Sequence, residues 1–162
     1  MLFKRRKIRM EKIKATKEKI KELFGSIIDN SDNYNLVYGY HREFSDNLED
    51  YLYTSLIIGY DIDALELIII ETDKDFLEVS NIIKLKKSDF TKAIFNNNLD
   101  EYIIYLNKKK RDKICFSLIS ENYIDTDILA FIEQENEIED FKDFYQEFKR
   151  KPRVKLKKKL SE

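Results

Sequence analysis

Leu-Glu-Leu-Ile-Ile-Ile (Leu65–Ile70) is the most apolar six-residue stretch of the chain. It is too short to cross a bilayer, which takes about 20 apolar residues. Isoleucine is β-branched and favours an extended backbone, and apolar side chains on both faces indicate a strand that is covered on both sides. We therefore expect this stretch to be the central strand of a β-rich core.

Period-two alternation of apolar and polar residues predicts further strands on either side of this stretch. In the first of them, Tyr34, Leu36, Tyr38, Tyr40 and Phe44 share one face, which makes it a half-buried strand. The fourth places Leu77, Val79, Ile83 and Leu85 on its buried side, and the last two pair as a hairpin. The seven predicted strands span residues 34–44, 51–60, 65–72, 77–85, 90–95, 102–106 and 113–119, although the pattern of residues 90–95 fits a helical turn equally well.

Two amphipathic helices are predicted outside the strands. Residues 8–28 carry a narrow apolar seam at spacings of three, four and seven, and this seam can dock on the domain, pair with a partner helix or lie in a membrane interface. A longer helix is expected over residues 127–149, with Asp125 or Thr126 as its N-cap and Pro152 beyond its end. The expected fold class is α+β and mainly β.

Seven short strands followed by one amphipathic helix is an element order that resembles the pleckstrin-homology-like domains, including their bacterial members. The apolar run Glu66–Asp73, followed after a turn by Ile82–Phe90, is similar to strands three and four of those domains. The resemblance implies a bent seven-stranded antiparallel sandwich or barrel capped by the C-terminal helix. We expect a basic N-terminal helix at residues 1–30, the β-domain at 34–149 and a basic tail at 150–162.

The loops depart from the lipid-binding members of that family. The resemblance implies a headgroup site between the loops that join strands one and two, three and four, and six and seven. Here the first loop (residues 43–50) is acidic and the second (71–75) is mostly acidic, whereas only the third (Lys108–Arg111) is basic. Two acidic loops would repel a polyphosphate, so a phosphoinositide site of the family type is not expected.

Charge is strongly segregated along the chain. Residues 1–23 carry ten Lys/Arg and three Glu, and residues 149–162 carry eight Lys/Arg and one Glu, although the whole chain has a net charge of −1. Two basic ends therefore flank an acidic middle. This asymmetry is typical of ends that engage nucleic acid or a membrane surface, or of ends that fold back onto the acidic part or stay solvated.

The candidate anion-binding residues lie in the N-terminal segment, the third loop and the tail. They are Lys4, Arg5, Arg6, Lys7, Arg9, Lys108, Lys109, Lys110, Arg111, Lys151, Arg153, Lys155, Lys157, Lys158 and Lys159.

No motif for catalysis, a metal or a cofactor stands out. His41 is expected on a polar strand face and Cys115 as a small packing residue, and one His with one Cys does not make a zinc cluster. Glu71, Asp73 and Asp75 are spaced like calcium ligands, but a calcium loop needs Gly and Glu where Phe76 and Ile82 stand. One cysteine and no signal-peptide pattern favour the reducing cytoplasm. The basic ends leave open a place at the membrane periphery or within a larger assembly.

A non-enzymatic interaction module is therefore the expected function, with an acidic body that binds protein and basic ends that engage a membrane surface or nucleic acid. The alternative is an acidic inhibitor or immunity-type protein that blocks a basic site on its target.

Overall fold

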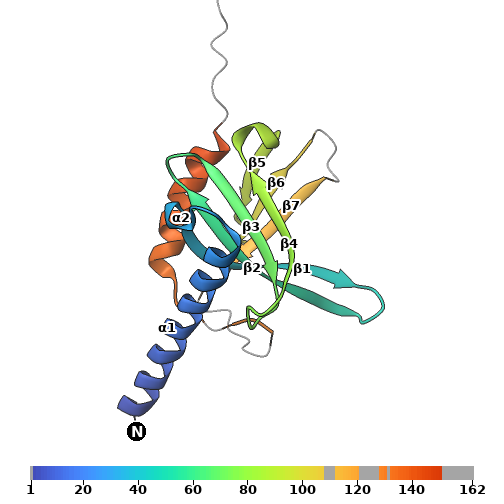
Figure 1. The fold of residues 1–162 in the computed structure, drawn as a ribbon. Helices are drawn as coiled ribbons and strands as arrows, with labels where there is room; N and C mark the ends of the chain where they lie inside the picture. Colours follow the sequence, from blue (N-terminus) through green and yellow to red (C-terminus); the bar gives the residue numbers. More distant parts are fainter. Residues whose placement is uncertain (1, 108–111, 121–127, 131, 151–162) are drawn as a thin grey trace, which may run out of the picture.

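The computed structural model describes residues 2–107, 112–120, 128–130 and 132–150, and it confirms an α+β fold that is mainly β. A long N-terminal helix, seven strands and a C-terminal helix follow one another along the chain (Figure 1). The elements are α1 (Leu2–Ile27), η1 (Ser31–Asn33), β1 (Asn35–Ser45), β2 (Asp50–Asp61), β3 (Glu66–Thr72), β4 (Val79–Leu85), η2 (Lys87–Asp89), β5 (Lys92–Asn96), β6 (Glu101–Tyr105), β7 (Lys113–Leu118) and α2 (Glu135–Lys149).

All seven strands form one antiparallel sheet in the order β4-β3-β2-β1-β7-β6-β5. β1 joins the two parts of the sheet, because it pairs with β2 along its whole length but with β7 only at Gly39 and Tyr40. The sheet bends at this junction, and the β1–β2 hairpin and the β6–β7 hairpin diverge from it (Figure 1). A Cβ atom on Gly39 would lie 2.6 Å from the Ser117 carbonyl oxygen, so this close approach of β1 to β7 requires glycine.

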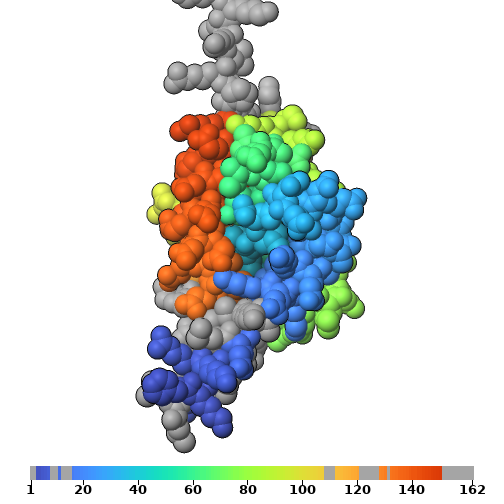
Figure 2. Space-filling view, turned by 60° about the vertical axis from the view of Figure 1, so that its left-hand side comes forward, coloured from blue at the N-terminus to red at the C-terminus, as the bar shows by residue number. Residues whose placement is uncertain are grey.

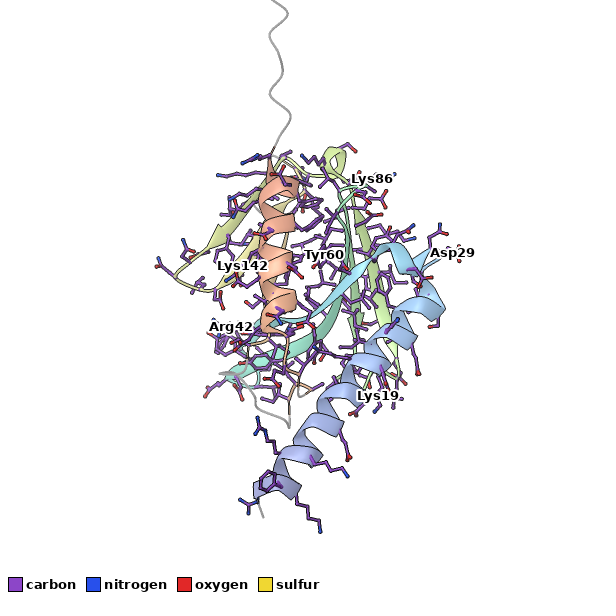
Figure 3. The ribbon with its side chains drawn as sticks, turned by 90° about the vertical axis from the view of Figure 1, so that its left-hand side faces the viewer. Lys19, Asp29, Arg42, Tyr60, Lys86 and Lys142 are labelled. Atoms are coloured by element: carbon purple, nitrogen blue, oxygen red, sulfur yellow. The ribbon has the colours of Figure 1, made fainter. Side chains whose placement is uncertain are left out.

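Each face of the sheet is covered by one of the long helices. α2 lays Phe141, Phe144, Tyr145 and Phe148 on one face, and all four side chains are buried there. The second half of α1 lays Ile20 and Phe24 on the other face. Tyr60 lies between α2 and the sheet (Figure 3), with its ring centroid 4.9 Å from that of Phe144. Apolar residues are therefore needed on both sides of the middle strands.

The apolar stretch Leu65–Ile70 is covered on both faces, as expected. Leu67 and Ile69 belong to the α2 side of the core, and Ile68 and Ile70 to the α1 side. The expectation that this strand is central is wrong, because β3 lies second from the edge and β1 holds the central place. Double coverage reflects the helices above and below the sheet, and it does not require a central position.

The starts of β3 and β4 differ from the prediction because of local backbone. Leu65 has a φ of 51° and closes the turn before β3, so the strand begins at Glu66. β4 begins at Val79, because the Asp73 carboxylate accepts hydrogen bonds from the N–H groups of Leu77 and Glu78 and holds that stretch as a turn. Leu77, which was expected on the buried side, is consequently 78% exposed.

The C-terminal helix is shorter than expected. It begins at Glu135, the described residues 128–130 and 132–134 are not helical, and the expected caps at 125 and 126 lie outside the described residues. The buried Gln134 side chain accepts a hydrogen bond from Tyr38 N–H (2.9 Å) and donates to the carbonyl oxygens of Tyr38 (2.7 Å) and Ile119 (2.9 Å). Leu129 and Ile132 pack on the α1 side of the core, so their helix-like spacing occurs outside a helix.

The N-terminal helix is longer than the predicted residues 8–28. It begins at Leu2 and continues through the Lys/Arg-rich start of the chain to Ile27. Lys and Arg are good helix formers, and no Gly or Pro interrupts these residues before Gly25.

Candidate functional site

The two halves of α1 have different surroundings. The second half (residues 15–27) docks on the sheet through Ile20 and Phe24, which are 3% and 1% exposed. The first half (residues 2–14) extends beyond the sheet and α2, as Figures 1 and 3 show. In the space-filling view of Figure 2 its first turns form a separate lobe at the lower end of the molecule. The basic start of the chain is thus held away from the body.

Docking of the second half depends on a close fit at one glycine. A Cβ atom on Gly59 of β2 would lie 2.4 Å from Cζ of Phe24, so the Phe24 ring occupies the space that a side chain would need. The same ring meets Tyr34, with the centroids 5.6 Å apart. Lys17 Nζ lies 2.6 Å from Glu137 Oε1 and ties α1 to α2.

A groove of about 320 Å³ runs between α1, the start of β1 and α2. The Lys17–Glu137 ion pair lies along it. Burial alone would raise the pKa of the Glu137 carboxyl, but the hydrogen bond and the charge of Lys17 hold it below its usual value. Tyr34 donates to Glu66 Oε2 at 2.8 Å, and burial and then this bond raise the pKa of Tyr34 to about 12. These polar groups satisfy one another and serve the helix contact.

Only the N-terminal group of the predicted anion-binding residues lies in the described structure. Lys4, Arg5, Arg6 and Lys7 are exposed on the first turns of α1, and Arg9 follows them on the same helix. Lys108–Arg111 and the candidates from Lys151 to Lys159 lie outside the described residues. The elements that lead to them end far from the start of α1: the β6–β7 end and the last turn of α2 lie at the opposite pole (Figure 1). The described structure therefore does not gather the three basic groups into one site.

A second candidate site was not predicted. The outer part of the β1–β2 hairpin, residues 41–54, which we call the arm, projects from the body (Figure 1). Within the described residues, β3 pairs with β2 only from Ser55 onward and β7 pairs with β1 only up to Tyr40. The arm is therefore a two-stranded ribbon with no described strand on either edge.

The two faces of the arm differ in chemistry. Residues paired across the ribbon share a face, so Arg42 and Tyr53 lie with the pair Phe44–Tyr51 on one face. The Phe44 and Tyr51 rings are 5.3 Å apart and 52% and 44% exposed, and the Arg42 guanidinium lies 4.8 Å from the Tyr51 centroid. The other face carries three pairs, His41–Thr54, Glu43–Leu52 and Ser45–Asp50. One face is therefore aromatic, and we call the other the acidic face because it carries the carboxylates of Glu43 and Asp50 and no Lys or Arg.

Sequence reasoning missed the arm because its pattern equals that of a buried strand. Tyr34, Leu36, Tyr38 and Tyr40 do pack in the α1-side core, as predicted, whereas Phe44 of the same alternating series is half exposed. The acidic composition of residues 43–50 was the only signal that this end faces water.

The residues considered for catalysis or metals have structural partners. His41 Nδ1 donates to the Cys115 carbonyl oxygen at 3.0 Å, next to the β1–β7 junction. Burial, and then the Glu101 carboxylate, raise the pKa of the Cys115 thiol and so disfavour the thiolate. Burial would raise the pKa of Asp73, but hydrogen bonds from the N–H groups of Glu78 and Leu77 lower it. Among the described residues, no group of three or more His, Cys, Asp or Glu side chains is placed to hold a metal ion.

None of the helices in the described part of the chain is both long and apolar enough to span a membrane. Comparison with protein-family models, with curated proteins and with solved structures finds no match to this chain.

Proposed function

We propose that the protein is a non-enzymatic interaction module that attaches to an anionic membrane surface through the first half of α1. The observation that carries this proposal is the division of α1 into a docked half and a projecting half that bears Lys4, Arg5, Arg6, Lys7 and Arg9. The β-sheet and α2 then face away from the surface and are open to protein partners.

The energies are sufficient for reversible attachment. Each Lys or Arg close to an anionic leaflet contributes roughly 1 kcal/mol, so five contribute about 5 kcal/mol when all reach the surface. Phe3 is 88% exposed among these cations. Burying a phenylalanine side chain in the interface adds about 1.5–3 kcal/mol. A duplex bound through its phosphates gains nothing from Phe3, whereas a single strand can stack a base on such a ring. Because Phe3 is the one aromatic residue within residues 2–14, we favour the membrane.

A pleckstrin-homology-like domain remains our proposal for the fold family. The order of the seven strands and the position of α2 over one face of the bent sheet support it. The acidic residues of the first loop, among them Asp46 and Glu49, are exposed and argue against a headgroup site there. Attachment through α1 needs no such site, and it is compatible with a peripheral protein in the cytoplasm.

Vesicle sedimentation of the full chain tests the proposal. The test variant is K4E/R5E/R6E/K7E, and the matched control is K84E/K92E/K113E/K142E, which changes the net charge equally at exposed lysines of the sheet and α2. We expect binding to phosphatidylcholine–phosphatidylserine vesicles to fall by about 100-fold or more in the test variant and much less in the control. Equal losses, or binding to pure phosphatidylcholine, would contradict the proposal.

The same variants separate a membrane from nucleic acid. If the wild-type chain binds duplex or single-stranded nucleic acid and not vesicles, and K4E/R5E/R6E/K7E loses this binding, the anionic surface is nucleic acid. If the wild-type chain binds neither vesicles nor nucleic acid, the result favours the alternative of an acidic inhibitor. That alternative is favoured by the arm, where four carboxylates (Glu43, Asp46, Glu49 and Asp50) accompany Arg42.

A further inference from the structure

We propose that the arm of one molecule binds the C-terminal segment Arg153–Lys157 of a second copy as an added β-strand. The inference does not depend on the proposed attachment of α1 to a membrane. The contact would join the outer edge of β2 to the C-terminal segment of the next molecule and so produce head-to-tail self-association.

The receptor side is the outer edge of Asp50–Thr54. β3 ends opposite Ser55 in the register of β2 and β3, so an added strand beside these residues would continue the line of β3. Unpaired strand edges are templates for such pairing. A two-stranded ribbon is marginally stable in water, so a third strand also stabilises the arm. The opposite edge is less suitable, because β1 is held near β7 by the His41–Cys115 hydrogen bond.

The ligand side is defined by the sequence after Arg150. Arg153, Lys155 and Lys157 alternate with Val154 and Leu156. In an extended strand, successive side chains point to opposite faces. The segment as a strand therefore has one basic face and one apolar face, and Pro152 precedes it without interrupting it.

The two faces of this segment match the two faces of the arm. Val154 and Leu156 fit the aromatic face of Phe44, Tyr51 and Tyr53, and the three cations fit the acidic face with Glu43 and Asp50. The contact between the Arg42 guanidinium and Tyr51, at 4.8 Å, leaves the aromatic face with a cation of its own. Cations of an added strand are therefore directed to the acidic face, where no Lys or Arg of the arm lies.

The geometry favours binding to the arm of a second copy over binding to the arm of the same chain. Arg150 lies at the Asp61 end of β2: its carbonyl oxygen accepts a hydrogen bond from Lys87 (2.8 Å), and the neighbouring Lys86 pairs with Glu66, which lies opposite Asp61. The arm is at the other end of β2, and the six steps from Asp61 to Ser55 already span about 20 Å. Three residues reach about 11 Å at most, so Arg153 cannot reach its own arm.

The contact joins different surfaces on the two copies, so it is a heterologous contact. Such a contact leads to rings or open chains and not to a closed two-fold dimer. We therefore expect sedimentation velocity of the full chain, over a range of concentrations, to show a series of oligomers at low salt. Because the contact contains ion pairs, we expect the series to shift to monomer at high salt.

Variants on each side test the assignment. We expect R153E/K155E/K157E and Y51S/Y53S each to raise the concentration for half-association by about tenfold or more, and K84E/K92E/K113E to leave it nearly unchanged. L156P keeps every cation but removes a backbone donor and the extended pairing, and it should weaken association as strongly as the charge reversal. Wild-type association of L156P would show attraction by charge alone and overturn the added strand.

A competitor measures the contact without changing the fold. A synthetic peptide of residues 150–162 should dissociate the oligomers, and its L156P form should not. In the R153E/K155E/K157E chain, peptide binding should protect the amides of Asp50–Thr54 from hydrogen exchange. A monomer at all concentrations in low salt, oligomers that the peptide leaves intact, or protection outside the arm would each contradict the proposal.

Discussion

The β1–β2 hairpin has two parts with similar aromatic composition and opposite surroundings. Its root, residues 35–40 and 55–61, holds Tyr38 and Tyr60, which are 0% and 1% exposed. In the arm, Phe44 and Tyr51 are about half exposed. The difference comes from the neighbours, because β3 and the described part of β7 flank only the root. Alternating aromatic residues therefore specify a strand, and the surrounding elements decide whether it becomes core or surface.

The largest expected effect is the loss of stability when a charge is placed in the core beside the root and not in the arm. Ile69 of β3 is 1% exposed beside the root, whereas Leu52 of the arm is 53% exposed. We expect Ile69→Asp to cost more than about 4 kcal/mol and to abolish the cooperative thermal transition. Leu52→Asp should change the free energy of unfolding by less than about 0.5 kcal/mol. Similar melting curves for the two variants would refute the division of the hairpin.

One added methyl group on β2 should loosen the packing of α1 on the root. In Gly59→Ala the new Cβ atom collides with the Phe24 ring, and we expect a loss of about 1–3 kcal/mol through overpacking. Limited proteolysis should then cleave within the second half of α1. Gly25→Ala is the control, since its Cβ atom meets only Ser31 Oγ at 3.4 Å and its helix propensity rises. A chain with Gly59→Ala that resists protease like the wild type would contradict the role of Phe24.

Acid should weaken the contact of α1 with α2 by a smaller amount. Because the folded pKa of Glu137 lies below the ordinary value of 4.5, its contribution to stability is present above pH 4.5 and is lost as the pH falls through the folded pKa. Lys17→Met removes the partner that lowers this pKa. Thermal melts below pH 4.5 should therefore show a shallower decline in Lys17→Met than in the wild type. Parallel declines would show that the ion pair contributes nothing.

The smallest expected effect lies at the turn of the arm. Glu49 has a φ of 49°, a left-handed conformation that glycine adopts without a steric penalty. Glu49→Gly should change the free energy of unfolding by less than about 1 kcal/mol, towards greater stability, because relief of strain exceeds the added entropy of the unfolded chain. Chemical denaturation can resolve the sign, and a clear destabilisation would mean that the Glu49 side chain has a role in the turn.

Much of the fold was predictable from the sequence because burial on one face leaves a periodic pattern. The period-two pattern of residues 34–40 and the apolar run of β3 indicated the strands and the double cover correctly. The start of α2 was not predictable, since Leu129 and Ile132 fit a helical spacing and only the hydrogen bonds of Gln134 to β1 show what holds the residues before Glu135 outside the helix. Local periodicity carries no information about such distant partners.

The candidate sites were predictable to different degrees. The basic start of α1 was identified from charge alone, but its division into a docked and a projecting half depends on where Phe24 meets Gly59. The arm was not identified, because strand length and pairing, and not composition, leave its edges open. A site that exists because a strand lacks a neighbour can be identified only from the tertiary structure.

Hydrogen exchange with and without anionic vesicles tests the central claim most directly, because one measurement reports on α1, the root and the arm. The account predicts that phosphatidylcholine–phosphatidylserine vesicles slow exchange in the first half of α1. Exchange in the root should stay slow throughout, and exchange in the arm should not change at protein concentrations where the chain is monomeric. Slower exchange in the arm or on α2, with no change in the first half of α1, would contradict it.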